Sequence, residues 1–472
     1  MSIKFVDTQD IAPTVAIVGG GASGALLASQ LLRAGNARVV LIERGERIAR
    51  GVAYGTTFAG HLLNVPAASM TALPGDPEHF LRYVRAHHDA AAQLTTFVPR
   101  LVFGAYLEHT LRESERLAAP GASLLRWQGE VVDIAAADGA RPWLMTFADG
   151  SRAHADRVVL AVGNLPPRDP PLASGSWPAD PARYIGDPWR AGALADRAPG
   201  PVLLVGTGLT MVDIALQLQQ GGDQRIVALS RGGLFPHTHR TGGAAPTQGV
   251  PVPDPTTSLT ALLRFVRAAA VVAEIGGGDW RDAVNALRPV TPGLWAALPE
   301  AEQRRFLDRL ARYWDVHRHR LAPDVAAAVQ ELRDRGALTF VRGRIRSVSE
   351  HSDGVVVTVS ERGASAPSEL RVASIVNCTG PTGNVLAGGS RLLENLCGAG
   401  IARSHPLALG LDTGADGAVR DARGHEHETL FALGPLRRGE LWESTAVPEI
   451  RAQAQALAQR LVQPRALRAL AG

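Results

Sequence analysis

The chain is poor in cysteine. Only Cys378 and Cys397 occur among its 472 residues, and they form no CxxC pair. This scarcity argues against the redox-dithiol class of enzymes and is typical of a reducing compartment, so we expect a cytoplasmic protein. Cys378 lies in the apolar run "ASIVNCTG", a setting that favours a small core residue over a nucleophile.

The sequence also lacks long apolar runs and any concentration of charge. No run of about 18 apolar residues is present that would span a bilayer, and residues 1–14 lack the apolar core and cleavage site of a secretory signal. Lysine and arginine number 49 against 45 acidic residues, and they are not gathered into a basic run. We therefore expect neither a membrane nor a nucleic-acid partner.

The first 45 residues follow the order strand, glycine turn, helix and strand. Apolar spacing predicts strands at 15–18 and 38–42 and a helix at about 22–34. This order opens the βαβ unit of a doubly wound sheet. A second unit of the same kind begins at Pro201, with "PVLLVGTGLTMVDIALQLQQ".

The first turn carries a complete dinucleotide fingerprint. Gly19 permits the tight turn, Gly21 lets the backbone approach a pyrophosphate, and Gly24 lets the helix pack closely on the strand. Glu43 follows 19 residues after Gly24, at the end of the second strand, where a carboxylate accepts hydrogen bonds from a ribose diol. The turn is therefore predicted to bind the adenosine half of FAD.

The second turn departs from the fingerprint at two places. It has Gly206 and Gly208, but Met211 replaces the third glycine, and the same count of 19 residues leads to Ser230 followed by Arg231. A hydroxyl and a guanidinium suit a 2′-phosphate, so the exchange favours NADPH over NADH. Two interpretations remain open: a working NADPH site with looser packing at Met211, or a structural copy of the first turn.

The remaining segments predict how the two units are connected. We expect a β-meander over 124–163, a proline-rich linker over 164–178 and a mostly helical region over about 256–335. An apolar strand ends at Gly163, and "IVNCTGPTGN" at 375–384 is a similar strand end. Each alone is typical of any buried strand with a glycine turn, but as a pair they suit two crossings between domains.

Together these patterns predict an α/β fold with two Rossmann-like dinucleotide-binding domains. Residues 1–170 and 380–472 would form the FAD-binding domain. It would be interrupted by an NAD(P)H-binding domain at 200–375, with the helical insertion at about 256–335 as a lid or substrate wall.

The chain resembles the YdhS-like family of FAD/NAD(P)-binding proteins, and more distantly the class B flavin monooxygenases, including the amino-acid N-hydroxylases. The segments that carry the resemblance span nearly the whole chain: "GVAYGTTFAGHLLNVPAASM" (51–70), "GTGLTMVD" (206–213), "SRGGLFPHTH" (230–239), "YWDVHRHRLAP" (313–323) and "GPLRRGELWESTAVPEIRAQA" (434–454). The FxGxxxHxxxW pattern of Baeyer–Villiger enzymes is missing, which argues against ketone oxygenation.

The resemblance implies roles for three further residues. Asn64 would donate an amide hydrogen bond near the reactive edge of the flavin, although it also suits a turn before Val65. Gly434 would bring the backbone close to the flavin phosphate and ribitol. A helix beginning near Thr445 would direct its positive end at the flavin, and Ser444 and Thr445 would equally serve as N-caps.

Histidines and arginines recur in the resembling segments, and their roles stay open. The sparse cysteines and interleaved arginines argue against a metal site, which leaves phosphate or substrate contacts and purely structural roles. Arg318 and Arg320 would recognise an anion or pair with Asp315 and Asp324. The histidines concerned are His237, His239, His317 and His319.

We thus expect FAD and NADPH as cofactors, a small-molecule substrate and no metal, with no expectation about oligomeric state. Asn64 is the candidate catalytic residue. The residues expected to contact a cofactor are Gly19, Gly21, Ser23, Gly24, Glu43, Arg44, Asn64, Val131, Gly163, Gly206, Gly208, Thr210, Ser230, Arg231, Gly434 and Thr445.

Three functions follow from these features. The first is an NADPH-dependent flavin monooxygenase that hydroxylates the nitrogen or sulfur of a small amine or amino-acid-like substrate through a C4a-hydroperoxyflavin. The second is an NADPH-dependent flavin reductase or dehydrogenase without oxygenation. The third is a flavin- or nucleotide-binding regulatory protein without turnover.

Overall fold

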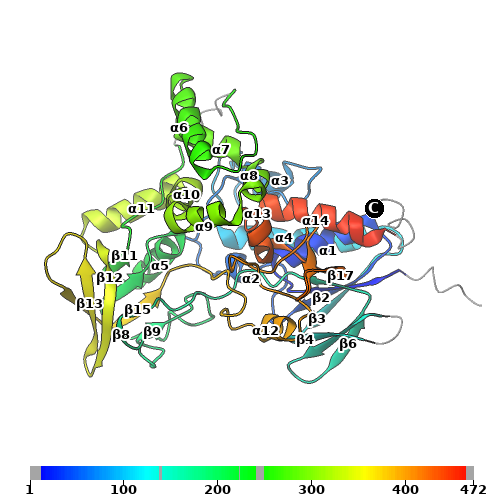
Figure 1. Cartoon of the computed structure of the whole chain (residues 1–472), viewed down its shortest axis with the longest axis horizontal. Coiled ribbons are helices and arrows are strands. Elements are labelled where there is room, and N and C mark those ends of the chain that lie inside the picture. The colour runs from blue at the N-terminus through cyan, green and yellow to red at the C-terminus, as the bar shows by residue number, and fades with distance from the viewer. Residues whose placement is uncertain (1–11, 138–140, 223, 241–248, 464–472) are drawn as a thin grey trace, which may run out of the picture.

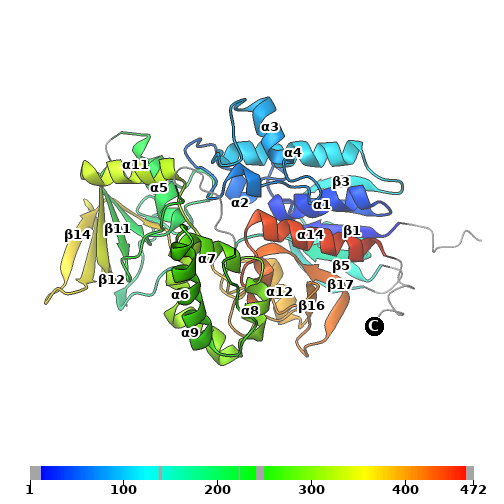
Figure 2. The same ribbon diagram turned by 90° about the horizontal axis from the view of Figure 1, so that it is seen from above.

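A computed structural model describes residues 12–137, 141–222, 224–240 and 249–463. Most of the N-terminal segment considered for a secretory signal therefore lies outside the described residues. Two lobes built around separate sheets lie side by side, and a group of helices lies across their junction (Figures 1 and 2). Among the described helices, none has both the length and the apolar character needed to cross a bilayer.

The first lobe is built on a six-stranded sheet with the order β16-β17-β7-β1-β2-β3. All pairings are parallel except that of β16 with β17. The strands are β1 (Thr14–Val18), β2 (Arg38–Glu43), β3 (Ser123–Gln128), β7 (Arg157–Leu160), β16 (Ala418–Arg420) and β17 (Glu426–Ala432). Every residue of β1 and β7 is buried, as expected for parallel strands covered on both faces.

Helices cover one face of this sheet, and a small second sheet covers the other. In β1, Val15 and Ile17 belong to the core on the helical side of the sheet, and Ala16 and Val18 belong to the core on the opposite side. On the helical side lie α1 (Ala22–Ala34), α3 (His79–His87), α4 (Arg100–Arg116) and α14 (Val447–Val462). On the other side lie β4 (Val131–Ala136), β5 (Trp143–Phe147), β6 (Arg152–Ala155) and α12 (Arg391–Gly398).

The meander expected over 124–163 is therefore shorter than predicted. Only β4, β5 and β6 form an antiparallel sheet. β3 and β7, which flank them in the sequence, join the parallel sheet through β2 and β1. Short apolar strands look alike in sequence whether they pair in parallel or antiparallel fashion, so the boundary was misplaced.

The second lobe is built on an eight-stranded sheet with the order β14-β13-β12-β11-β10-β15-β9, and β8 pairs with β12. The long strand β12 pairs in parallel with β11 through its first half and in antiparallel fashion with β13 through its second half. The strands are β8 (Ser174–Gly175), β9 (Tyr184–Ile185), β10 (Val202–Val205), β11 (Ile226–Ser230), β12 (Leu338–His351), β13 (Gly354–Glu361), β14 (Ser368–Val372) and β15 (Ser374–Asn377).

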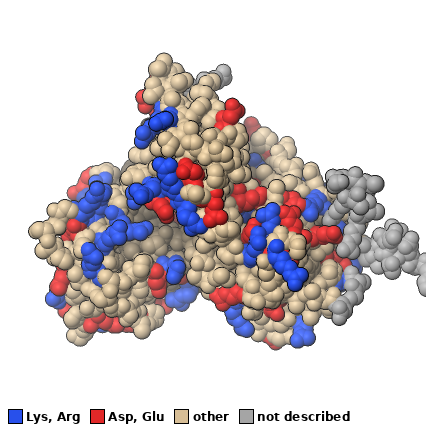
Figure 3. Space-filling model, viewed as in Figure 1, with Lys and Arg blue, Asp and Glu red and all other residues tan. Residues whose placement is uncertain are grey.

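Two helices, α5 (Leu209–Gln219) and α11 (Pro323–Asp334), pack on one face of the second sheet. The chain enters this lobe after β7 and leaves it after β15. The residue limits of the two domains stay a prediction. On the face seen in Figure 3, basic and acidic side chains are interspersed, with no field of one sign.

The predicted helical region forms five helices that precede α11, and they lie across the junction of the lobes (Figure 2). They are α6 (Leu259–Ile275), α7 (Trp280–Leu287), α8 (Thr291–Ala297), α9 (Glu300–Arg309) and α10 (Ala311–Arg318). Ser258 caps α6 by accepting a hydrogen bond from the Ala261 N–H at 3.2 Å, and Asp279 with Asp282 forms a capping box on α7.

This insertion is fastened to the C-terminal segment of the first lobe. The rings of Trp295 and Trp442 stack with centroids 5.0 Å apart, and the Trp295 indole donates a hydrogen bond to the Gly439 carbonyl at 2.7 Å. Trp442 follows the short helix α13 (Arg438–Leu441). The insertion thus belongs to the second lobe by sequence but packs on the first.

Candidate functional site

The first glycine turn leaves no room for side chains at two of its positions. Gly19 has φ +108°, and a Cβ there would overlap the backbone of Ala161. A Cβ on Gly24 would overlap the carbonyl oxygen of Gly19. Gly21 is the N-cap of α1 and supplies no side-chain cap, so the first N–H groups of the helix are left for a ligand.

Glu43 is held at the end of β2 by backbone hydrogen bonds. Its Oε2 accepts from the Gly20 N–H at 2.9 Å, and its Oε1 accepts from the Gly45 N–H at 3.0 Å. Each carboxylate oxygen keeps a further lone pair, so the group is oriented and still able to accept from a ribose hydroxyl. Arg44 is exposed, 3.9 Å from Glu130.

The C-terminal segment reaches the N-terminus of α1. Gly434 has φ +74°, and a Cβ there would lie 2.8 Å from the Ser23 hydroxyl oxygen. Its N–H donates to Gln453 Oε1 at 3.0 Å. The structure therefore brings together Ser23 and Gly434, which are far apart in the sequence. Val131 lies in β4 with its side chain buried in the core, so only its backbone is left to face a ligand.

The helix predicted near Thr445 begins two residues later, at Val447, with Ala446 as N-cap and no side-chain cap. The N-cap interpretation of Ser444 and Thr445 is therefore wrong. The Ser444 hydroxyl is buried and has no hydrogen-bond partner among the described residues. An unpaired buried hydroxyl and a glycine cradle at α1 are features that a bound FAD would satisfy.

The second turn resembles the first but has room at its third position. Gly206 has φ +118°, and a Cβ there would overlap the backbone of Cys378. Gly208 is the N-cap of α5, and nothing lies within 4 Å of a Cβ built on it. Met211 is fully buried in the core of the second lobe. The helix stands far enough from the turn to accept a methionine at the position corresponding to Gly24.

Ser230 is held by hydrogen bonds within the second turn, whereas Arg231 is exposed. The Thr207 hydroxyl lies 2.9 Å from Ser230 Oγ and 2.5 Å from the Leu234 carbonyl oxygen. Because a carbonyl only accepts, Thr207 donates to Leu234, and the Ser230 hydroxyl donates to Thr207. Ser230 also accepts from the Gly233 N–H at 3.0 Å. Ser230 therefore braces the turn, whereas Arg231 is exposed and is the stronger candidate for contacting a phosphate.

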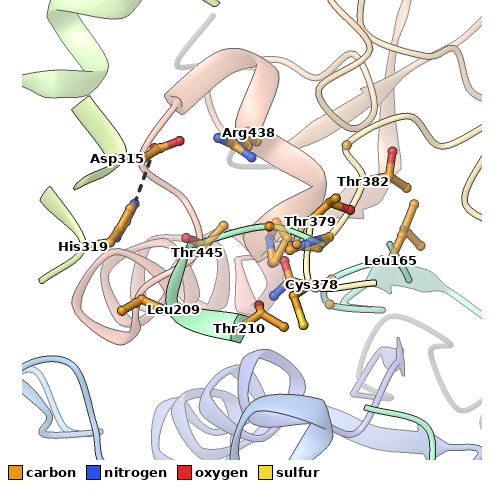
Figure 4. A pocket seen from close by; sticks show the side chains of 18 of the residues that line it. Leu165, Leu209, Thr210, Asp315, His319, Cys378, Thr379, Thr382, Arg438 and Thr445 are labelled. Carbon is orange, nitrogen blue, oxygen red and sulfur yellow. Dashed lines mark ion pairs between the residues drawn. The ribbon is translucent and has the colours of Figure 1, made fainter. Parts of the chain in front are cut away.

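A cavity of about 390 Å³ lies where the two lobes and the insertion meet (Figure 4). Five of the predicted site residues line it: Gly163, Gly206, Gly208, Thr210 and Thr445. The second turn, the strand end after β15, the segment 435–445 and helix α10 all contribute to its wall. The carboxyl ends of parallel strands, where ligands bind in doubly wound sheets, thus open into this space.

Helix α10 and its C-cap residue place an acid and a histidine in the cavity, Asp315 and His319, with 4.0 Å between Asp315 Oδ1 and His319 Nε2 (Figure 4). Burial raises the pKa of Asp315 to about 6, with Arg438 opposing and Glu443 adding to the shift. Burial, reinforced by Arg318 and other nearby arginines, lowers the pKa of His319 to about 3. At neutral pH the pair is a carboxylate beside a neutral imidazole.

Cys378 also lines the cavity but is an inert thiol. It is buried, as its apolar surroundings predicted. Burial, with the negative charge of Asp213, raises its pKa, so the reactive thiolate is suppressed.

Asn64 connects the lobes through its backbone. Its carbonyl oxygen accepts from His239 Nε2 at 2.8 Å, and its side-chain amide makes no hydrogen bond within the described part of the chain. Asn64 is not among the described residues that line the cavity. Its catalytic role stays a prediction, and this contact favours a structural role for His239.

A second contact between the lobes centres on Asp213 of α5. Its carboxylate pairs with Arg100 at 2.8 Å, and its carbonyl accepts from His61 Nε2 at 3.1 Å. Burial raises the pKa of Asp213, and the Arg100 charge opposes this shift. Buried charges are tolerated only when paired, so Arg100 and Asp213 hold α4 and α5 together.

Arg318 and Arg320 of "DVHRHR" do not pair with Asp315 or Asp324, the two acids that the sequence suggested as their partners. Arg318 contacts Glu443 at 3.0 Å and Glu449 at 3.8 Å, and Arg320 donates to Asn285. The rings of His237 and His317 lie 4.5 Å apart against Trp280. Within the described ranges, no three His, Cys, Asp or Glu residues gather as a metal site.

Sequence reasoning missed Asp315 and Arg438 as cavity residues, whereas His319 was among the histidines for which a phosphate or substrate contact was left open. The spacing of four residues between Asp315 and His319 places both on one face of a helix, and that signal was available. The approach of Arg438 was not, because it depends on how the insertion packs against α13.

Residues 16–165 match the model of a family described as FAD-NAD(P)-binding. The match covers less than half of the chain and includes the first glycine turn, Glu43 and Gly163. The chain therefore carries an FAD-NAD(P)-binding domain in its first lobe. No curated protein matches the chain.

Solved structures with the same fold cover nearly the whole chain. Reduced ornithine hydroxylase from Pseudomonas aeruginosa superposes with a TM-score of 0.66 at 14% identity, over 96% of this chain and 99% of that chain. L-lysine 6-monooxygenase from Pseudomonas syringae gives 0.63 at 15% identity, over 95% and 99%. Ornithine N-hydroxylase from Kutzneria sp. 744, with reduced FAD, NADP+ and L-ornithine, gives 0.59 at 14%, over 96% and 99%.

These superpositions confirm the predicted fold class, an α/β fold of the kind found in flavin monooxygenases with two dinucleotide-binding domains. At such low identity they establish the fold alone, because one fold supports many reactions.

Proposed function

We propose that this protein is an FAD-containing, NADPH-dependent monooxygenase that hydroxylates the nitrogen or sulfur of a small substrate. The observation that carries the proposal is the cavity of about 390 Å³, which is lined by both the second glycine turn and the C-terminal segment that reaches α1. One half-open cavity thus adjoins residues of both predicted dinucleotide sites, the arrangement that electron transfer between two cofactors requires.

The residues suited to hold the two cofactors lie on separate elements. Gly19, Gly24 and Glu43 suit the adenosine and pyrophosphate of FAD, while Gly208 and Arg231 suit NADPH. When bound there, FAD would supply two-electron redox chemistry, with NADPH as the source of the electrons. The protein's part is to bind, orient and shield these groups.

Shielding depends on the insertion. Trp442 lines the cavity and is covered by Trp295, and α10 closes the adjacent wall. Exclusion of water protects reactive intermediates, so an insertion fastened over the cavity supports oxygenation. The resemblance to the YdhS-like family and the fold of the ornithine and lysine hydroxylases agree with this choice but do not identify the substrate.

An NADPH-dependent reductase or dehydrogenase is the second candidate. Four threonines, Thr207, Thr210, Thr379 and Thr382, line the cavity, although the Thr207 hydroxyl already donates to the Leu234 carbonyl and the Thr379 hydroxyl to Asn377 Oδ1. This observation favours the second candidate, because hydroxyls hold water near the site and water shortens the life of an oxygenated intermediate. A non-catalytic nucleotide-binding protein is the third.

The deciding experiment mixes the purified holoprotein with NADPH in the absence of oxygen and then admits oxygen. We expect NADPH to bleach the oxidised-flavin band promptly. After oxygen is admitted, the band should return only after a delay, and little peroxide should be released in a single turnover. An immediate return with one peroxide per NADPH would establish the reductase instead. Failure to bind FAD, or no bleaching, would exclude both enzymes.

Arg231→Ala is expected to weaken NADPH binding by about tenfold or more and to leave NADH binding nearly unchanged, because only NADPH carries the 2′-phosphate. Stopped-flow reduction at several concentrations of each cofactor gives the two dissociation constants. Arg225→Ala is the matched control, since Arg225 is also exposed but lies before the opposite end of β11. Equal losses for NADPH and NADH would remove the 2′-phosphate argument.

A further inference from the structure

Helix α6 of the insertion projects from the rest of the molecule (Figure 1). It packs on α7 and α9, and its buried residues include Ala269 and Ala273. Its other side exposes the apolar side chains of Val271, Val272 and Ile275, and Ile275 keeps 82% of its surface exposed. Apolar side chains that adjoin one another on a projecting helix mark a contact surface, because a partner that binds there removes them from water.

The exposed side of α6 follows the spacing of paired helices. Its exposed residues recur at steps of three and four, so they form one stripe along the helix. Such a stripe corresponds to the a and d positions of a heptad, which face the partner when two helices pack together. Small residues in the stripe let the two helix axes approach each other. The α6 stripe comprises Ala261, Arg264, Ala268, Val271 and Ile275.

Two charges beside the α6 stripe complement each other in an antiparallel pair of helices. Arg267 and Glu274 are exposed on the same edge of the stripe, seven residues apart. About two turns of helix separate them, so they do not meet within one chain, and neither makes an ion pair with another described residue. In an antiparallel pair of α6 helices, Arg267 would face the partner's Glu274, and the two-fold axis would repeat the contact.

We propose that α6 forms a homodimer contact, in which the α6 helices of two copies of this chain pack antiparallel about a two-fold axis. Val271 would lie against the partner's Ala268, and Ile275 against the carbon stem of the partner's Arg264, whose charge stays in water. A two-fold contact uses one self-complementary patch on both copies, and the α6 stripe with its flanking charges is such a patch. The inference goes beyond the proposed function and does not depend on it, because none of the described residues that line the cavity belongs to α6.

The charges of α6 favour a second copy of the chain over a lipid surface. Arg264 and Arg267 would suit anionic headgroups, but Glu274 adjoins Ile275 at the apolar end of the helix and would be repelled by them. A second copy pairs both signs. The helix has 17 residues and is about 25 Å long, which makes the contact smaller than a standard interface. We therefore expect a dimer with a dissociation constant in the micromolar range.

The test measures the self-association of the full-length chain by sedimentation velocity. The samples range from about 1 μM to about 200 μM, which brackets a micromolar dissociation constant. We expect the weight-average sedimentation coefficient to rise with concentration from that of a monomer to that of a dimer. No larger species should form through this contact, because a two-fold contact closes on itself.

Exchanges of charge test the antiparallel register. Arg267→Glu and Glu274→Arg each place like charges opposite one another in both copies of the contact, so each should weaken the dimer by about tenfold or more. The double variant restores opposite charges and should recover most of the loss. Ile275→Asp should leave a monomer at every concentration, because it places a carboxylate among apolar side chains. Arg116→Glu and Leu117→Asp, exposed at the end of α4, are the matched controls and should dimerise like the wild type.

The α6 dimer is overturned if the wild type stays monomeric at every concentration, or if the single exchanges leave the dimer unchanged. It is also overturned if the double variant dimerises no better than the single variants, because the two charges then do not face each other. Flotation with vesicles of phosphatidylserine and phosphatidylcholine tests the other occupant. A chain that stays monomeric and binds these vesicles, but loses binding in Ile275→Asp, uses α6 on a membrane instead. The unfolding midpoint verifies that each variant is folded.

Discussion

Replacing Arg318 by methionine is expected to lower the free energy of unfolding by about 3–5 kcal/mol. Arg318 and Glu443 are each only 6% exposed and lie 3.0 Å apart. The substitution would leave the Glu443 carboxylate buried beside the Trp314 indole as its remaining donor, and an unpaired buried charge is costly. Chemical denaturation followed by tryptophan fluorescence measures the loss, because Trp295, Trp314 and Trp442 lie at this contact.

Two variants test whether burial causes the effect. In the double variant Arg318→Met with Glu443→Gln the loss should be smaller, because no charge is left unpaired. Arg304→Met breaks an ion pair whose side chains are both 56% exposed, and it should change stability by about 0.5 kcal/mol or less. If Arg318→Met costs no more than Arg304→Met, the buried pair does not fasten the insertion.

Gly24→Ala is expected to reduce the FAD content of the purified protein below about a tenth of the wild-type value. The new methyl group would overlap the Gly19 carbonyl oxygen. Because that contact is with backbone, relief requires α1 to move away from the turn that it forms with β1. Flavin absorbance relative to protein concentration measures the content, and the unfolding midpoint should fall with it.

Gly208→Ala at the second turn is the matched control for Gly24→Ala. Gly208 has φ −85°, and a methyl group there meets nothing within 4 Å, so FAD content and stability should match those of the wild type. NADPH should still bind more weakly, because the methyl group occupies the approach of a pyrophosphate to the backbone. Normal FAD content in Gly24→Ala would show that close packing at the first turn is not required.

The parts of the fold that depend on local sequence pattern could be predicted from the sequence. Both glycine turns sit between an apolar strand and an amphipathic helix, and α1 was placed at its observed limits, Ala22–Ala34. The meander failed because pairing direction is a property of neighbouring strands and not of the strand itself. β3 pairs with β2, and a chain segment of 79 residues (44–122) separates the two.

In the candidate site too, residues that follow a local pattern were predicted and contacts between distant segments were not. Gly206, Gly208 and Gly163 were identified because their spacing from strand ends has a physical meaning. The pairing of Arg318 with Glu443 joins residues 125 positions apart, and nothing in "DVHRHR" indicates which acid its arginines meet. Ser230 was predicted to contact the cofactor, but in the structure its hydroxyl donates to Thr207, which in turn donates to the Leu234 carbonyl.

Two of the buried ion pairs described above have a mechanical consequence. Arg100 with Asp213 joins α4 to α5, and Arg318 with Glu443 joins the insertion to the segment before α14. Two bodies connected at one place can swing about it, but two bodies connected at two separate places resist rotation about either. These pairs oppose hinge bending between the lobes and the insertion, so we expect ligands to enter the cavity without a large displacement of its walls.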